Sequence, residues 1–310
     1  MTNAKKNIGY QGALGSYSYQ ACTNFFTDQN YRGYRFFHEV FRAVEGREID
    51  FAVIPVENST AGRVMEIYNL LPESSIKIVG EYLLPIHHCM MIPKKSLPQD
   101  TAERPLTAEQ KAAIMRDILE VRSHPQALAQ CRKFMEKNLP KAVGRDQFDT
   151  AGAARDLSDR NDYKLAAIAS KIAATTYDME IIAENVEDCI GNTTRFIVLT
   201  KDGVHDQGLP ADHPMITTLL FETLHEPGSL LRALKIFEDY GVNLTKLETY
   251  IANPDNPNPK FYVDLNSSKD SKTMDECMAA FKNHTQNTTI LGTYPASTQR
   301  GQGNSFLPVN

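Results

Sequence analysis

A cluster of polar side chains stands directly before an apolar run late in the first 200 residues. It offers an amide, two hydroxyls and a guanidinium, from Asn192, Thr193, Thr194 and Arg195. The hydrophobic residues 196–199 that follow predict a strand, so the polar group lies at the mouth of a rigid element. Thr194 can donate a hydroxyl hydrogen bond, and the planar fork of Arg195 suits a carboxylate. The alternative interpretation is a turn in which Thr and Asn side chains bond their own backbone.

Four further loops share this polar character and lie beside expected strands and helices: residues 9–18, 57–60, 123–126 and 149–151. The first opens a helix whose backbone N–H groups and dipole favour an anion. Its glycine spacing is not G-x-G-x-x-G, so a dinucleotide site is not indicated. Each loop alone is more often a helix N-cap than a site. Together with Thr194 and Arg195, the loops indicate convergence on a small, oxygen-rich anion.

The order of expected elements divides the chain. Strand and helix patterns alternate over residues 8–199, which is typical of a mainly parallel α/β sheet with ligands at the carboxyl ends of its strands. That length is generous for one sheet, so we expect two α/β lobes facing a cleft, the second over about 89–178. A linker is expected at 201–213. Residues 214–296 follow the ferredoxin-like order βαββαβ. The polar tail, 297–310, is expected to be disordered.

Composition excludes several kinds of partner. The net charge is −5, so neither nucleic acid nor an anionic membrane is expected to bind. No apolar run reaches the roughly 18 residues of a membrane span, and the first residues show no signal or transit pattern, so a cytoplasmic protein is expected. The five cysteines are scattered without a C-x-x-C and are expected to be reduced core residues. The histidines form no ligand-spaced cluster, so no metal site is expected.

Five stretches occur in an order that resembles the prephenate dehydratase family: GALGSYS (12–18), PVENS (55–59), SHPQAL (123–128), AIAS (167–170) and NTTRF (192–196). Together they cover residues 7–200. The Thr-Arg-Phe sequence is the specific part, whereas the Gly-rich start alone would carry little weight. Residues 214–296 resemble the ACT regulatory domain that follows in this family.

The resemblance implies a catalytic unit over residues 5–200, built of two α/β lobes like type 2 periplasmic binding proteins, with the site between the lobes. It implies conversion of prephenate to phenylpyruvate, CO2 and water without a cofactor, in phenylalanine biosynthesis. It also implies a homodimer or homotetramer that L-phenylalanine inhibits by binding to the ACT domain.

The family's catalytic position falls on Thr194, which is implied to donate a hydrogen bond to the departing hydroxyl. Arg195 is the second expected catalytic residue, and together with the N–H groups around Gly15 and Ser16 it is expected to hold the pyruvyl carboxylate. A strong ion pair on the ring carboxylate would stabilise the ground state against loss of CO2, so neutral donors are expected there. The expected substrate-binding residues are Gly15, Ser16, Tyr17, Asn58, Ser59, Thr150, Thr193 and Phe196.

Several alternatives stay open. Glu57 is a rival acid, although a carboxylate facing a dianion is unfavourable unless it is protonated. His124 is alternatively a core residue that satisfies a helix start. Arogenate could replace prephenate, because no residue here separates the two substrates. A non-catalytic amino-acid sensor would lack the Thr194 hydroxyl or the Asn58-Ser59 pair, and both are present.

The effector site is expected at Gly228, Ser229, Leu230, Asn243 and Leu244. Gly228 lets the backbone approach a bound amino acid closely, and the helix that follows suits its carboxylate. This chain departs from the family there. The usual Gly-Ala-Leu is Gly-Ser-Leu, and the usual Glu-Ser-Arg-Pro is ETYI at residues 248–251. The strength and identity of the effector therefore stay open.

Overall fold

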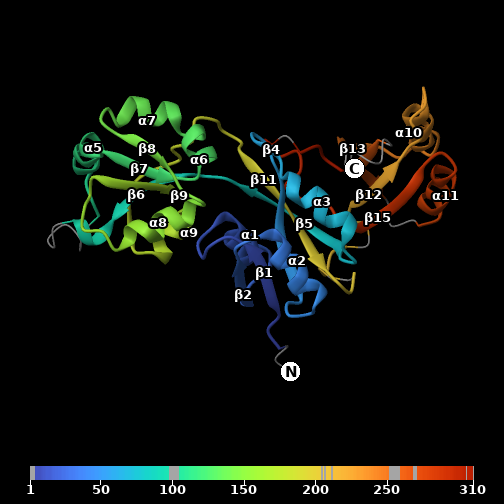
Figure 1. Ribbon diagram of the computed structural model, residues 1–310, viewed down its shortest axis with the longest axis horizontal. Coiled ribbons are helices and arrows are strands. Elements are labelled where there is room, and N and C mark those ends of the chain that lie inside the picture. The colour runs from blue at the N-terminus through green and yellow to red at the C-terminus, as the bar shows by residue number, and fades with distance from the viewer. Residues whose placement is uncertain are drawn as a thin grey trace.

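Three β-sheets, each with its own helices, lie along the long axis of the molecule (Figure 1). The computed structural model describes residues 4–97, 105–203, 205, 207–210, 212–250, 259–267, 271–304 and 306–309. The first sheet occupies the middle, and the second and third form the two ends.

The first lobe is built on the sheet with strand order β2-β1-β3-β11-β5, to which the short β4 is added through β3. Its strands are β1 (Asn7–Gln11), β2 (Asn30–Tyr34), β3 (Phe51–Asn58), β4 (Gly62–Arg63), β5 (Lys77–Pro85) and β11 (Thr193–Thr200). Its helices are α1 (Tyr17–Phe25), α2 (Phe37–Glu45) and α3 (Met65–Glu73). Strand β1 runs parallel to β2 and β3, whereas β11 runs antiparallel to β3 and β5. Strand β11 and most of β3 are buried because the sheet is covered on both faces, and the central residues of both strands are apolar.

The second lobe is built on the sheet with strand order β10-β6-β9-β7-β8. Its strands are β6 (Cys89–Pro93), β7 (Glu120–Ser123), β8 (Val143–Asp146), β9 (Leu165–Ala169) and β10 (Met179–Glu184). Its helices are η1 (Lys94–Ser96), α5 (Ala108–Asp117), α6 (Pro125–Gln130), α7 (Arg132–Asn138), α8 (Thr150–Ser158) and α9 (Lys171–Thr176). Because β10 pairs with β6, this lobe extends to Glu184 and does not end near residue 178 as expected.

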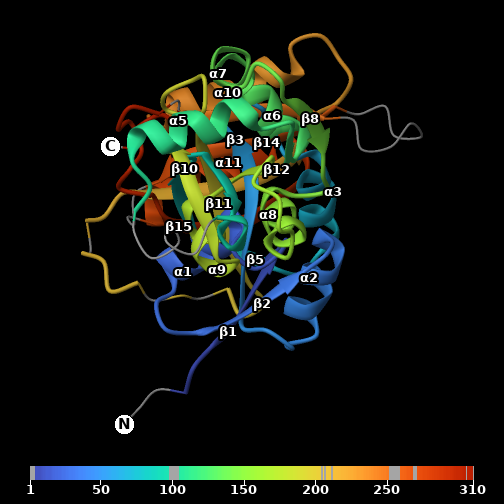
Figure 2. The ribbon, with the colours of Figure 1, turned by 90° about the vertical axis from the view of Figure 1, so that its left-hand side faces the viewer.

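Two short segments join the lobes: residues 86–88, between β5 and β6, and residues 185–192, between β10 and β11. The view from the end formed by the second lobe shows its helices in front of the first-lobe strands (Figure 2). The expected arrangement of two α/β lobes is therefore confirmed, and it places β11 directly after one of the connections.

The third sheet has the antiparallel order β13-β14-β12-β15. Its elements are β12 (Met215–Glu222), α10 (Ser229–Asp239), β13 (Leu244–Tyr250), β14 (Lys260–Ser267), α11 (Ser271–Lys282) and β15 (Gln286–Pro295). This is the expected βαββαβ order, and we call residues 214–296 the C-terminal unit.

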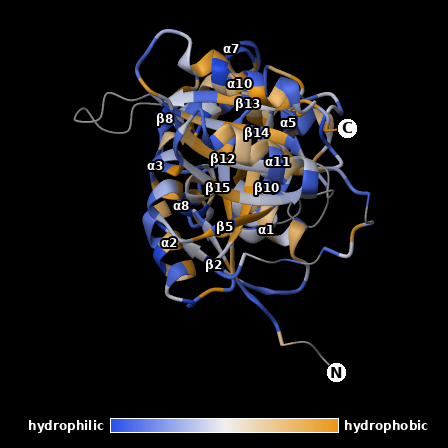
Figure 3. Cartoon of the chain, turned by 90° about the vertical axis from the view of Figure 1, so that its right-hand side faces the viewer, coloured by the Kyte–Doolittle hydropathy of each residue, from blue (hydrophilic) through white to orange (hydrophobic). Residues whose placement is uncertain are grey.

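Both faces of the third sheet are covered. On one face, Phe221 packs with Phe237 of α10 and Phe281 of α11. On the other face, Ile216 and Leu220 join the same apolar cluster as Ile54 and Ile197 of the first lobe. Its strands accordingly carry many hydrophobic residues (Figure 3). The C-terminal unit is therefore packed directly on the sheet that carries β11.

The tail beyond Pro295 is ordered over its described residues, contrary to the expectation of disorder. Arg300 and Phe306 are both buried, and Val309 packs on the apolar cluster of the first lobe. The backbone N–H of Ser297 donates to Glu81 of β5. A polar composition suggested no anchor, but the buried side chains of Arg300 and Phe306 provide one.

Among the described residues no helix is long and apolar enough to cross a bilayer, and no three His, Cys, Asp or Glu side chains form a group that could hold a metal ion. All five cysteines are free thiols, and four of them are buried.

Candidate active site

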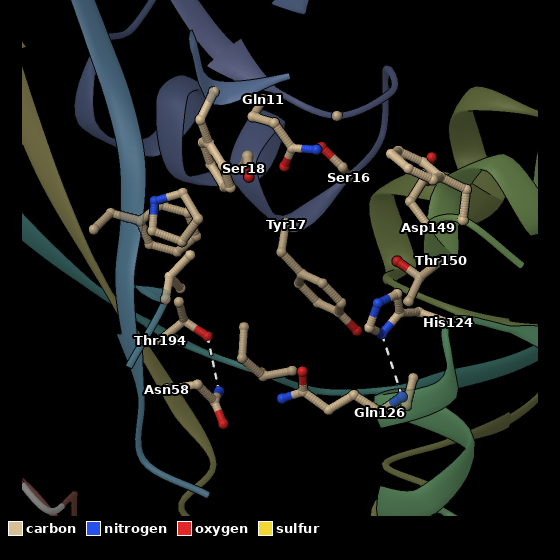
Figure 4. A pocket seen from close by; sticks show the side chains of 18 of the residues that line it. Gln11, Ser16, Tyr17, Ser18, Asn58, His124, Gln126, Asp149, Thr150 and Thr194 are labelled. Carbon is tan, nitrogen blue, oxygen red and sulfur yellow. Dashed lines mark hydrogen bonds between the residues drawn. The ribbon is translucent and has the colours of Figure 1, made fainter. Parts of the chain in front are cut away.

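A cleft of about 510 Å³ lies between the two lobes. Its walls come from β1, β3, α1 and β11 of the first lobe and from α6 and α8 of the second, with loops from each (Figure 4). Six residues expected at the site line this cleft: Ser16, Tyr17, Asn58, Thr150, Thr194 and Phe196. Phe196 is a buried apolar part of the wall, and the others bring polar groups.

Thr194 lies near the start of β11, opposite Asn58 of β3 in the strand register. Its Oγ1 accepts a hydrogen bond from Nδ2 of Asn58 at 2.9 Å (Figure 4). The other end of the Asn58 amide, Oδ1, accepts hydrogen bonds from the backbone N–H groups of Thr60 and Ala61. Those donors fix which end of the amide faces Thr194. Since Thr194 is the acceptor in this bond, its own hydroxyl proton is left for a partner in the cleft.

A chain of hydrogen bonds continues from Asn58 to α1. Asn58 Nδ2 also donates to Asn192 Oδ1 at 2.7 Å, and Asn192 Nδ2 donates to Gln130 Oε1 at 3.3 Å. The same Oε1 lies 2.9 Å from His88 Nε2, and His88 Nδ1 lies 2.7 Å from the Tyr17 hydroxyl. Burial lowers the pKa of His88, so the ring is neutral at pH 7, donating from Nε2 and accepting at Nδ1. Both lobes contribute, so the chain ties the two walls together.

Two helices direct their N-termini at the cleft. Ser16 caps α1 by accepting from the N–H of Tyr19 at 3.2 Å, and Asp149 caps α8 by accepting from the N–H of Gly152 at 2.6 Å. Thr150 is the first residue of α8 and lines the cleft. The partial positive charge of helix N-termini favours an anion between them.

Arg35 is the one lysine or arginine among the described residues that line the cleft. It comes just after β2 of the first lobe, and its guanidinium carbon lies 5.8 Å from the centre of the Phe148 ring of the second lobe. It therefore places a formal positive charge at the boundary between the lobes.

Arg195 does not reach the cleft, and the expectation that it holds a substrate carboxylate is wrong. Its side chain is 1% exposed, and Nε donates to Glu81 at 2.8 Å while Nη1 donates to Asp264 at 2.5 Å. Nη2 donates to the hydroxyl of Tyr294 at 2.9 Å. Successive side chains of a strand point to opposite faces. Because Thr194 points into the cleft, Arg195 faces the C-terminal unit, and it pairs there with Asp264 of that unit and with Glu81 of β5 in the first lobe.

Three other expected residues, Ser59, Thr193 and Gly15, lie behind the cleft and do not line it. The expectation that they contact the substrate directly is therefore wrong. Ser59 Oγ accepts from the backbone N–H of Thr193 at 2.9 Å, and the Thr193 hydroxyl donates to the Gly191 carbonyl at 3.2 Å. Gly15 has φ of +80°, and a Cβ there would lie 3.0 Å from Cα of Ala173 in α9. These residues hold the loops around Ser16 and Thr194 in place.

The structure also shows the surroundings of Glu57 and His124, whose roles the sequence left open. Glu57 pairs with Lys246 of β13 on the side away from the cleft, which excludes it as the acid. His124 lines the cleft, but its Nδ1 accepts from the backbone N–H of Gln126 at 3.2 Å as the N-cap of α6. It therefore satisfies a helix start.

The polar cleft residues missed from the sequence include Gln130, His88 and Arg35. Gln130 follows Gln126 by four residues on one helix, so the two share a face, and that spacing could have identified it. His88 belongs to a connection between lobes that only the fold defines. Arg35 lies just after a partly exposed strand, outside any polar loop pattern, and no sequence signal marks it.

A second hollow of about 420 Å³ lies on the C-terminal unit. Gly228, Ser229 and Leu230 line it, and Gly228 has φ of +77° as the N-cap of α10. Asn243 and Leu244, at the start of β13, are not part of its lining. Of the altered stretch at 248–251, Ile251 lies outside the described residues, and Glu248 forms an ion pair with Arg63 of β4 at 3.0 Å. The hollow brings together three of the five expected effector residues.

Comparison with known proteins gives the site a family context. The family model described as prephenate dehydratase matches residues 8–204. The chain is 32% identical over 292 residues to a bifunctional chorismate mutase/prephenate dehydratase of Aquifex aeolicus, covering 94% of this chain and 74% of that protein. It is 32% identical over 304 residues to arogenate dehydratase 5 of Arabidopsis thaliana, and the match covers 93% of this chain and 67% of that protein. A prephenate dehydratase from Arthrobacter aurescens, solved in complex with L-Phe, has the same fold, with a TM-score of 0.79 at 23% identity over 95% of this chain and 91% of that chain.

Proposed function

Because this chain belongs to the prephenate dehydratase family, we propose that its interlobe cleft binds prephenate and converts it to phenylpyruvate, CO2 and water. The observation that carries the proposal is the Thr194 hydroxyl, which accepts from Asn58 and so presents its proton to the cleft. The reaction belongs to aromatic amino acid biosynthesis, where its product supplies phenylalanine.

The chemistry requires help for a poor leaving group. The bond between the ring and its carboxylate breaks to release CO2, and its electron pair enters the ring. The ring becomes aromatic as the C–O bond at C4 breaks. The departing hydroxide needs one proton to leave as water. Thr194 donates the hydrogen bond to that oxygen, and since an alcohol is a weak acid, transfer is partial and late in C–O cleavage. Solvent restores any proton that Thr194 gives up.

The two carboxylates of prephenate need different surroundings. The pyruvyl carboxylate keeps its charge throughout, so we assign it to Arg35 and the N-terminus of α1 at Ser16 and Tyr17. The ring carboxylate loses its charge as CO2, and a tight ion pair would oppose that loss. The neutral hydroxyl of Thr150 therefore suits it, whereas Asn58 gives its two amide protons to Thr194 and Asn192 and acts by orienting Thr194.

Arogenate is the second candidate substrate. It differs from prephenate by an amino group in place of the keto group of the side chain. Glu66 and Asp149 bring carboxylates to the cleft lining, where they would favour an ammonium. The similarity to the Arabidopsis arogenate dehydratase supports the same candidate.

The deciding experiment is incubation of the purified protein with each substrate, following phenylpyruvate from prephenate by its absorbance in alkali and phenylalanine from arogenate by chromatography. The proposal expects turnover that saturates with prephenate, and the ratio of kcat/KM ranks the two substrates. Absence of turnover with both would leave the cleft as the binding site of a non-catalytic sensor and would overturn the proposal.

We further propose that the C-terminal unit is an ACT domain that binds L-phenylalanine in the hollow at Gly228, Ser229 and Leu230, in a homodimeric or homotetrameric cytoplasmic enzyme. The helix start at Ser229 suits an amino-acid carboxylate, and the Phe-bound solved relative supports phenylalanine as the effector. Calorimetry tests this: binding of L-phenylalanine at micromolar to millimolar concentration is expected, and no heat at millimolar concentration would contradict it.

A further inference from the structure

The C-terminal tail inserts a charged side chain into the protein interior. Arg300 is 8% exposed, and its guanidinium forks onto Glu81 of β5, with Nε 2.6 Å from Oε1 and Nη2 2.8 Å from Oε2. Its Nη1 donates to the Leu307 carbonyl at 3.2 Å, and the N–H of Gly301 donates to the Phe306 carbonyl at 2.8 Å. The tail thus forms a compact turn around Arg300, and a paired arginine fork is a specific, well-defined contact.

Glu81 receives a second arginine on its Oε2, because Arg195 Nε lies 2.8 Å from that atom. Arg195 continues to Asp264 of β14, which also accepts from the Thr218 hydroxyl at 2.6 Å. Two arginines and two carboxylates therefore alternate in a buried row, Arg300, Glu81, Arg195 and Asp264, with no net charge. Buried ion pairs are tolerated when their charges balance and their hydrogen bonds are satisfied.

Removal of Arg300 would leave two buried carboxylates sharing one arginine. An uncompensated buried charge is strongly unfavourable, so the row would have to rearrange, admit water or take up a proton. The side chain that must respond is Arg195, which joins both carboxylates. Arg195 is bonded in the chain to Thr194, and the two residues occupy opposite faces of β11.

We propose that Arg300 of the C-terminal tail is a positioning residue for the dehydration step: by balancing Glu81 it fixes Arg195, and through the backbone of β11 it fixes the Thr194 hydroxyl. The inference rests on the proposed function for its kinetic readout. The effect falls on the chemical step, because Arg300 touches no residue of the cleft lining, so substrate binding is left nearly unchanged.

The test compares three variants of the full chain. Arg300→Gln is expected to lower kcat about tenfold or more, since misplacing a reacting group by about 1 Å is costly, while KM changes less than about twofold. Arg300→Lys keeps the charge and is expected to recover part of the loss. The double variant Glu81→Gln with Arg300→Gln restores electroneutrality and is expected to turn over faster than Arg300→Gln alone.

Arg47→Gln is the matched control, because Arg47 also forks onto one carboxylate, Asp202, but at the surface, with both side chains more than half exposed. NMR of threonine methyl groups gives a readout that needs no substrate. The Thr194 methyl signal, identified by its loss in Thr194→Ser, is expected to shift in Arg300→Gln and to stay in place in Arg47→Gln.

The outcomes separate the two ideas. If the wild-type chain leaves prephenate and arogenate unchanged, the proposed function fails together with the kinetic role of Arg300, and the methyl shift then decides whether Arg300 positions the Thr194 side chain. If Arg300→Gln matches Arg47→Gln in kcat and leaves the Thr194 methyl signal in place, the inference is overturned. It is also overturned if the double variant is as slow as Arg300→Gln, or if the loss lies in KM.

Discussion

At the scale of the residue, the cleft is organised by the direction of single hydrogen bonds. Asn58 Oδ1 is committed to backbone donors, so its Nδ2 must face Thr194 and Asn192. The Thr194 proton is then free to meet a leaving group. A hydroxyl whose proton is directed in this way is preorganised for the transition state, which is where such interactions raise the rate.

Asn58→Asp tests this arrangement with almost no change in shape. A carboxylate accepts where the amide donated, so it would take the Thr194 proton and turn it away from the cleft. We expect kcat to fall by about 10²-fold or more, the scale attributed to a positioned acid. Steady-state kinetics give the value, with Ser59→Ala as a control in the supporting shell, expected to keep most of the activity. Equal kcat for Asn58→Asp and the wild type would contradict the assigned direction.

At the scale of the element, the loop before α1 is what joins the lobes at the cleft. Gly15 packs on α9, the Ser170 hydroxyl donates to its carbonyl at 2.7 Å, and the Tyr177 hydroxyl donates to the Leu14 carbonyl at 2.7 Å. A first-lobe loop is therefore anchored on the second lobe, and that anchor aims the N-terminus of α1.

Gly15→Ala is expected to disturb this anchor through two effects. Its φ of +80° disfavours a side chain by roughly 1 to 2 kcal/mol, and its Cβ would meet the α9 backbone at 3.0 Å. Gly241→Ala is a matched control, with φ of +67° and nothing within 4 Å. Both variants should lose thermal stability, but Gly15→Ala alone should raise KM, by about tenfold. Equal KM values in the two variants would argue against a role for this loop in binding.

The sequence predicted the helices and strands better than it predicted the long-range contacts of individual side chains. The alternation of strands and helices, the βαββαβ order and the polar loops at the cleft follow from local patterns. The same alternation could have separated Thr194 from Arg195, because neighbours on a strand face opposite ways. What could not be predicted is the partner of Arg195 on the other face of β11, because that partner, the carboxylate of Asp264, lies 69 residues later in the chain. Long-range burial decides that contact, and polarity alone had suggested a ligand.

At the scale of the whole molecule, the C-terminal unit and the tail are fastened to the catalytic lobes by buried charge. Lys246 of β13 pairs with Glu57, next to Asn58, and Asp264 pairs with Arg195, next to Thr194. Asn58 and Thr194 form the contact proposed for the leaving group, and the residue next to each of them in the chain therefore forms an ion pair with the third sheet. The polar tail and the unmarked Arg35 show where sequence patterns give no signal, since each acquires its role only from the packed structure.

The buried row of charges also predicts the response to acid. Burial would raise the pKa of Glu81, but Arg195, Arg300 and the N–H of Ser297 outweigh it and lower the pKa to about 2, from an ordinary value of 4.5. A carboxyl whose pKa is lowered by folding stabilises the folded state at any pH above the pKa that it has in the unfolded chain. That contribution is lost as the pH falls from about 4.5 towards 2.

Glu81→Gln should therefore be less stable than the wild type at pH 7, and the gap in the free energy of unfolding should narrow as the pH falls through that window. Denaturant unfolding at several pH values measures the gap, and other carboxyls cancel because both proteins carry them. A gap that stays constant from pH 7 to pH 2 would contradict the assignment.

The most direct measurement is kcat for prephenate in Thr194→Val beside Thr194→Ser, with the dissociation constant for prephenate measured in both. Valine keeps the shape of threonine and removes the hydroxyl, whereas serine keeps the hydroxyl. The account predicts that Thr194→Val loses about 10²-fold or more in kcat with binding nearly unchanged, and that Thr194→Ser stays within about tenfold of the wild type. A valine variant that turns over prephenate at close to the wild-type rate would contradict it.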